Sequence, residues 1–185
     1  MKKIYSSDGS LTPVVCLNRY QDKWAVRWNR ETVEPEEGIE EEDVQYSYLQ
    51  EDFDHKPTLQ EIKDVILGWV DAHTDAKILN GYEFTPDGAE EPIVVWLSKE
   101  SQTNFSEAHR LQVVPVKFKL NEDEEKNAIY HTFTTFAELD RFYKGGVAWI
   151  QQCLNEGWTE KDGIDWRPYE TLFAEKQLVS NIIHF

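Results

Sequence analysis

The chain has 185 residues, of which 40% are hydrophobic and 13% aromatic, which is enough apolar material for a packed core and excludes wholesale disorder. The formal net charge of −16 repels nucleic-acid phosphates and anionic lipids, so we expect no direct phosphate binding and no membrane association. No apolar run reaches the length of a membrane span, and the basic start lacks a signal-peptide core, which predicts a cytoplasmic protein.

The first quarter of the chain predicts β-structure. In residues 11–30, Trp24, Val26 and Trp28 alternate with polar or small residues, which is typical of a hairpin with its turn near residues 20–22. Cys16 in this hairpin and Cys153 both lie in apolar segments, so we expect two reduced, buried thiols.

Residues 34–43 are strongly acidic, with seven carboxylates in ten positions. The carboxylates lack the alternating spacing of a calcium loop, so the run predicts a solvated loop. Val44, Tyr46 and Tyr48 alternate directly after it and predict a further strand.

Two helices are predicted to begin in the same way. Thr58 and Glu61 form a T-x-x-E capping box before a helix that should run from about residue 58 to 78 and end near Asn80 and Gly81. A second box, Thr135 and Glu138, should open a helix that ends at Gly157. Both boxes follow strand residues, which leaves open a duplicated strand–strand–helix unit.

Shorter elements are predicted before, between and after these two helices in the sequence. The expected order is a hairpin over 81–98 with its turn at 86–88, a short helix over 99–110, a hairpin over 114–133, and a last short helix after Pro168. The pattern predicts an α+β fold in which antiparallel strand pairs, as hairpins or a meander, pack against two long amphipathic helices with one or two short helices. The expected segments are an N-terminal β-rich region (1–55), an α+β domain (56–172) and a C-terminal tail (173–185).

No residue pattern predicts a catalytic, cofactor-binding or metal-binding site. Ser98 lies beside Lys99 without a G-x-S-x-G or S-x-x-K motif, and it suits the N-cap of the helix over 99–110 better than a nucleophile. The five histidines include no H-x-x-x-H or H-x-H pair. Asp71 and Asp75 share a helix face, but His73 lies about 200° from either, so we expect solvated polar surface.

Two tryptophans are candidates for an interaction surface. Trp158 and Trp166 lie in the polar, turn-rich segment NEGWTEKDGIDWRPY, and burial against the last helix is the alternative for both. Gly145 and Gly146 lack the spacing of a phosphate loop and predict a helix kink or a close helix contact.

Several segments together resemble a known family. The stretches FDHKPTLQEIKDVILGWVDAHTDAKILNGYEF, VVWLSKESQTNF, VPVKFKL, YHTFTTFAELDRFY and IQQCLNEGWTEKDGIDWRPYE, within residues 53–172, are similar to a domain family of unknown function. The W-L-S step at 96–98 and the E-G-W step at 156–158 are the most specific parts. Phages and prophages of gut bacteria encode this family, commonly among tail and structural genes. Its members often have a longer segment before the PVKF strand, so the orientation of the helix over 99–110 does not carry over.

The resemblance implies a non-enzymatic, tail-associated structural or assembly component in the bacterial cytoplasm or the virion. Such a protein would act through protein contacts, by self-association or with other tail proteins, and the family brings no cofactor. The alternative is an acidic DNA-mimic inhibitor of a host DNA-binding protein, although the carboxylates crowd into 34–43 and 121–125 instead of forming two ordered rows. A hydrolase that uses Ser98 or a His–Asp pair is the weakest hypothesis.

Overall fold

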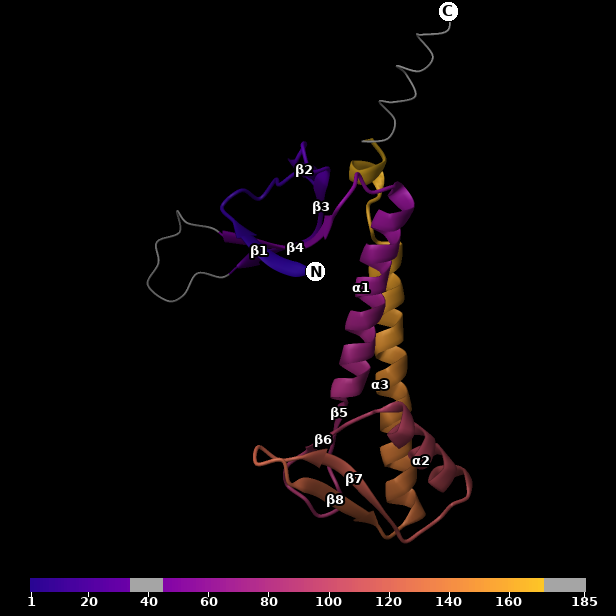
Figure 1. Cartoon of the computed structure of the whole chain (residues 1–185). Coiled ribbons are helices and arrows are strands. Elements are labelled where there is room, and N and C mark those ends of the chain that lie inside the picture. The colour runs from indigo at the N-terminus through magenta and orange to yellow at the C-terminus, as the bar shows by residue number, and fades with distance from the viewer. Residues whose placement is uncertain (34–44, 172–185) are drawn as a thin grey trace, which may run out of the picture. The chain divides into compact units, whose positions relative to one another are not determined.

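The structure is a computed structural model that describes residues 1–33 and 45–171 (Figure 1). Its contacts divide the chain into two compact units. Unit 1 contains the described residues up to Trp69 and from Ile164 onward, and unit 2 contains Val70–Gly163. The division falls inside a helix, whereas the sequence-based segments divide the chain at 55 and 172. The acidic loop over 34–43 and the tail over 173–185 lie outside the described residues. None of the described helices is long and apolar enough to cross a membrane.

Unit 1 is built on a four-stranded antiparallel sheet with the strand order β1-β4-β3-β2. The strands are β1 (Lys2–Ser6), β2 (Val14–Asn18), β3 (Lys23–Val33) and β4 (Gln45–Phe53). The predicted hairpin is β2–β3 and is confirmed. The predicted further strand is confirmed at Tyr46 and Tyr48 in β4, and Val44 lies outside the described residues. The sequence did not predict β1.

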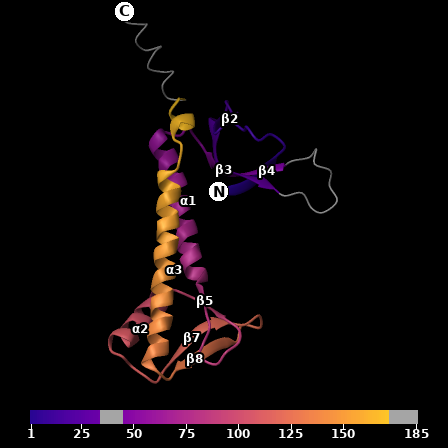
Figure 2. The same ribbon diagram turned by 180° about the vertical axis from the view of Figure 1, so that it is seen from behind.

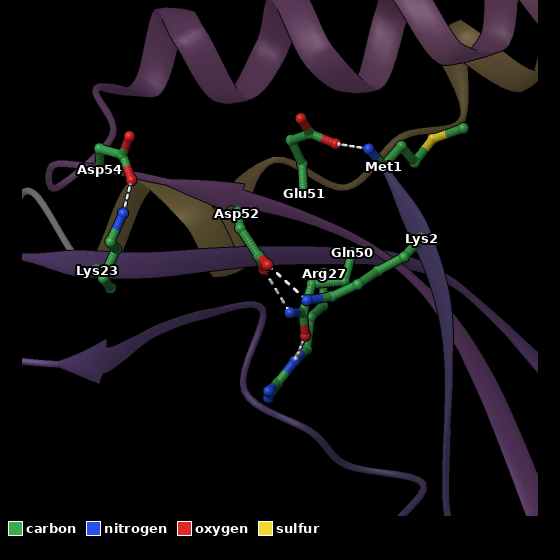
Figure 3. A network of polar contacts seen from close by, with 8 residues as sticks. All are labelled: Met1, Lys2, Lys23, Arg27, Gln50, Glu51, Asp52 and Asp54. Carbon is green, nitrogen blue, oxygen red and sulfur yellow. Dashed lines mark hydrogen bonds and ion pairs between the residues drawn. The ribbon is translucent and has the colours of Figure 1, made fainter.

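Side-chain pairs explain how the polar first residues form a strand (Figure 3). Lys2 Nζ donates to Asp52 Oδ2 over 2.5 Å, and Gln50 Nε2 donates to Asp52 Oδ1 over 2.6 Å. Arg27 Nε donates to Gln50 Oε1 over 2.9 Å, which links β3 to the same hydrogen-bonded side chains. The Lys2 hydrogen bond holds the pKa of Asp52 below its ordinary value. Cross-strand pairs of this kind fix the register of β1 on β4.

One face of this sheet packs on the beginning of α1 (Leu59–Asn80). The buried residues of this core are Val14, Val26, Trp28, Ile62, Ile66 and Tyr169. Tyr169 lies in the helical turn over 167–171, where a short helix was predicted after Pro168, and its hydroxyl donates to the Arg27 carbonyl over 2.9 Å. Burial raises the pKa of Tyr169 to about 12, so the hydroxyl stays a hydrogen-bond donor.

The capping box at the start of α1 is complete, as predicted. Glu61 N–H donates to Thr58 Oγ1 over 3.2 Å, and Glu61 Oε2 accepts from the Thr58 N–H over 2.7 Å. His55 Nε2 lies 2.9 Å from the other carboxylate oxygen. The Thr58 N–H, with further help from the Thr58 hydroxyl and from His55, lowers the pKa of Glu61 to about 2.

A pH-dependent stability difference follows from Glu61. Its pKa is lowered on folding, so the carboxylate stabilises the fold above its ordinary pKa of 4.5, and this contribution disappears as the pH falls to about 2. We expect a Glu61→Gln variant to melt below the wild type at about pH 7. The difference in Tm should shrink between pH 4.5 and about 2. A difference in Tm that stays constant down to about pH 2 would contradict the assignment.

Unit 2 contains two antiparallel hairpins, the helices α2 and α3, and the part of α1 from Val70 onward, so the coarse prediction of antiparallel strand pairs with helices is confirmed. Its elements are β5 (Tyr82–Phe84), β6 (Ile93–Val95), α2 (Lys99–Arg110), β7 (Val116–Glu122), β8 (Ala128–Phe133) and α3 (Phe136–Asp162). The Trp96 N–H donates to the Leu120 carbonyl over 2.9 Å and so connects the two hairpins. Aromatic rings fill the core, where Phe142 lies within 5.1 Å, between ring centroids, of Phe84, Phe105 and Phe133.

The prediction that Gly157 ends the second long helix is wrong. α3 continues to Asp162, and Gly163 is its C-cap. Gly157 is buried where α3 meets the C-terminal part of α1, and a Cβ there would lie 2.3 Å from Thr74 Oγ1. The glycine is therefore explained by a close helix contact and not by helix termination. Ion pairs between Lys77 and Glu156 and between Asp71 and Lys161 flank this contact.

Three further expectations need correction. Thr135 caps α3 as predicted, but Glu138 does not complete the capping box, because its carboxylate bonds to the Asp87 N–H and to His131. Cys16 is exposed on β2, and only Cys153 is buried. Trp96 is in phase with the apolar positions of its predicted strand, a pattern that predicts core packing, but its side chain is 42% exposed.

Candidate protein-contact surface

The serine that opens α2 has a structural role. Ser98 Oγ accepts from the Ser101 N–H over 3.1 Å, as expected of an N-cap. His109 lies at the other end of α2, eleven residues or about 16 Å along the helix, so the two side chains do not meet. His109 stacks on Tyr143, with ring centroids 4.2 Å apart, and its Nε2 lies 2.9 Å from Asp140 Oδ1.

The acidic residues of α1 do not form a metal site with His73. Asp71 pairs with Lys161 on α3. Across residues 1–33 and 45–171, no group of three or more histidine, cysteine or acidic side chains is placed to hold a metal ion.

A pocket of about 480 Å³ lies between α2 and α3. Figures 1 and 2 both place α2 beside the N-terminal half of α3. The lining is mainly apolar, from Tyr82, Leu97, Phe105, Phe142, Tyr143, Gly146, Val147 and Ile150, and α2 supplies a polar rim of Lys99, Gln102, Thr103, Ser106 and Glu107. A pocket of this size and lining is typical of sites that take an apolar group.

Gly146 lines this pocket, and both it and the preceding Gly145 lie against Tyr82, which is another lining residue. A Cβ on Gly145 would lie 2.8 Å from the Tyr82 ring, and one on Gly146 would lie 3.3 Å from it. The Tyr82 ring therefore fits flush against the helix, and its hydroxyl donates to the Phe142 carbonyl. Burial raises the pKa of Tyr82, which keeps this hydroxyl protonated. A close contact at the glycine pair was predicted and is present, but its partner is the Tyr82 side chain of β5 and not another helix.

An exposed row of side chains continues from the pocket along α3. Val147, Gln151, Leu154 and Trp158 recur every three or four residues and lie within an arc of about 60° on the helix. We call these four residues the α3 stripe. Val147 is 47% exposed and Trp158 is 53% exposed, although both are large apolar side chains. Leu154 is half-buried, and Gln151 is exposed.

The α3 stripe from Val147 to Leu154 lies in a stretch without charge. Residues 145–155 (GGVAWIQQCLN) include no charged side chain, in a chain of which 29% is charged. The nearest charges on the N-terminal side are Lys144 and Asp140, which pair over 2.7 Å. Lys144, and after it His109, hold the pKa of Asp140 below its ordinary value. The stripe therefore offers apolar contact without the desolvation of an ionised group.

The structure places the two candidate tryptophans in different units. Trp158 belongs to the α3 stripe in unit 2. Trp166 is half-buried against the core of unit 1, with Lys63 Nζ 5.4 Å from its ring centroid and Tyr169 beside it. Of the two, only Trp158 has a largely exposed ring. Sequence reasoning missed Val147 and Leu154, and their spacing within an uncharged stretch was the signal that could have found them.

We compared the chain with models of protein families, with curated protein sequences and with solved structures, and none of the three comparisons found a match.

Proposed function

We propose that this chain is a non-enzymatic protein that acts through protein–protein contacts, as a tail-associated structural or assembly component of a phage or prophage. The α3 stripe supports the contact part of this proposal, because the large apolar side chains of Val147 and Trp158 stay exposed and Val147 lies beside an apolar pocket. No charged residue lies between them on this face of the helix. In this proposal α1 and α3 are the two long amphipathic helices of the predicted fold, and α3 carries the contact surface.

The setting in a phage is supported by the sequence resemblance over residues 53–172. This resemblance implies a protein of the bacterial cytoplasm or the virion, with other tail proteins or further copies of itself as partners. The DNA-mimic alternative has less support, because many described carboxylates pair with cations of the same chain. Examples are Glu31 with Lys3, Asp52 with Lys2, Glu107 with Arg110 and Asp165 with Arg167. Such pairing lowers the free negative charge that a DNA mimic presents.

Two neighbouring glutamines provide a matched test of the α3 stripe. Gln151→Glu places a carboxylate between Val147, Leu154 and Trp158, whereas Gln152→Glu places the same charge about 100° further round the helix. Both glutamines are exposed, so both variants should fold. We expect Gln151→Glu to reduce the capture of partner proteins at least about tenfold, because a buried unpaired charge opposes association, and Gln152→Glu to leave capture unchanged.

The measurement is affinity capture with tagged full-length chain after prophage induction, followed by quantitative mass spectrometry. Gln152→Glu is a strict control because its new carboxylate lies four residues before Glu156. Like charges at this spacing destabilise a helix, so the control should lose more stability than Gln151→Glu does. Equal capture by all three proteins would show that partners do not use the stripe.

A further inference from the structure

We propose that the α3 stripe pairs with the same stripe of a second copy of this chain, with the two α3 helices antiparallel about a two-fold axis. The inference rests on the proposed function and specifies its partner. A two-fold contact uses the same surface on both copies, so the surface must be complementary to itself.

The α3 stripe has this self-complementarity because it carries both a projecting ring and a hollow. Trp158 projects at one end, and the pocket beside Gly146 and Val147 opens at the other, eleven to twelve residues or about 17 Å away along the helix. An antiparallel pair centred near residues 152 and 153 places each Trp158 against Val147 of the other copy, at the mouth of its pocket. A pocket of about 480 Å³ has room for an indole ring.

The charges at the ends of the stripe are complementary in the same register. Lys144 lies three residues before Val147, and Asp162 lies four residues after Trp158. Both are on the same side of the stripe, about 40° from Trp158 around the helix. Antiparallel pairing that brings Trp158 to Val147 therefore brings Lys144 of each copy to Asp162 of the other. Lys144 bonds to Asp140, yet its side chain is 71% exposed, so its ammonium has donors for a second carboxylate.

Two chains of −16 repel each other, so a second copy needs a contact surface with few carboxylates, and residues 145–155 carry none. A basic partner would be attracted to the acidic surface and not to this uncharged stretch. A small apolar ligand would fill the pocket and leave Leu154 and Trp158 uncovered.

The test is the molecular mass of the full chain by sedimentation equilibrium over a range of protein concentrations. We expect the wild type to approach twice its mass of 21.7 kDa as its concentration rises. Lys144→Glu and Asp162→Lys should each raise the dissociation constant about five- to tenfold, because each places like charges together at the ends of the pair. The double variant Lys144→Glu/Asp162→Lys should restore the wild-type dissociation constant, since the pair is re-formed with its signs reversed.

Controls separate this inference from the proposed function. Far-UV circular dichroism establishes that each variant is folded, and Gln152→Glu should dimerise like the wild type. A chain that stays monomeric at all concentrations, while Gln151→Glu still loses captured proteins, would overturn the second copy as occupant and leave the contact surface standing. A dimer that none of Gln151→Glu, Lys144→Glu and Asp162→Lys weakens would overturn the inference.

Discussion

Replacing Gly81 with alanine is expected to destabilise unit 2 by about 3–5 kcal/mol, the largest effect of any glycine substitution in the described residues. Gly81 connects α1 to β5 and has a φ of +80°, where a side chain is strained. An added Cβ would also lie 1.6 Å from the carbonyl oxygen of Val95, which is backbone of the neighbouring strand. Because β5 and β6 pair at Tyr82 and Val95, this clash can be relieved only by separating the strands.

Gly88 is the matched control for this prediction. It has the same φ of +80°, but nothing lies within 4 Å of the position that a Cβ would occupy. Gly88→Ala should therefore cost only the left-handed strain, about 1–2 kcal/mol. Urea unfolding of both variants, followed by tryptophan fluorescence, measures the difference. Equal losses of stability in Gly81→Ala and Gly88→Ala would contradict a clash between the added Cβ and the Val95 carbonyl.

The elements that the sequence predicted well are those whose signals are local. β6 ends at Val95 and Ser98 caps the next helix three residues later, so α2 begins and ends where expected. Asn80 and Gly81 end α1, because the left-handed backbone of a glycine is a local requirement. The hairpins were likewise indicated by alternation and by the turn at 86–88.

The predictions that were wrong or missing depend on contacts between residues that are far apart in the sequence. β1 is polar, and its register depends on partners such as Asp52, fifty residues later. Gly157 is typical of a helix end in the sequence alone, and only the structure shows that Thr74 packs against it. Trp158 was expected in a turn-rich segment, but it lies within α3. Its exposure became a candidate surface only when Val147 and Leu154 were found on the same face.

Replacing Glu138 with alanine should distinguish the local prediction from the tertiary one. As the last member of a capping box, Glu138 would be exposed and its loss mild. In the structure its side chain is only 4% exposed, and Oε1 accepts from the Asp87 N–H over 2.8 Å and lies 3.0 Å from His131 Nε2. Removing the buried carboxylate takes this acceptor from both groups, of which His131 is partly buried and Asp87 lies in an exposed turn. We therefore expect Glu138→Ala to cost about 3 kcal/mol.

Two further variants identify the origin of that loss. Thr135→Ala removes only the N-cap hydroxyl, which accepts from the Glu138 N–H over 3.3 Å, and should cost about 1 kcal/mol. Glu138→Gln keeps an acceptor oxygen of the same shape, so its loss should fall between those of the other two variants. The measurement is the free energy of unfolding of all three variants in urea. If Glu138→Ala cost no more than Thr135→Ala, the carboxylate would act only at the helix end. The expected order instead makes Glu138 the group that joins the loop at Asp87, strand β8 and helix α3, a link that the T-x-x-E pattern does not reveal.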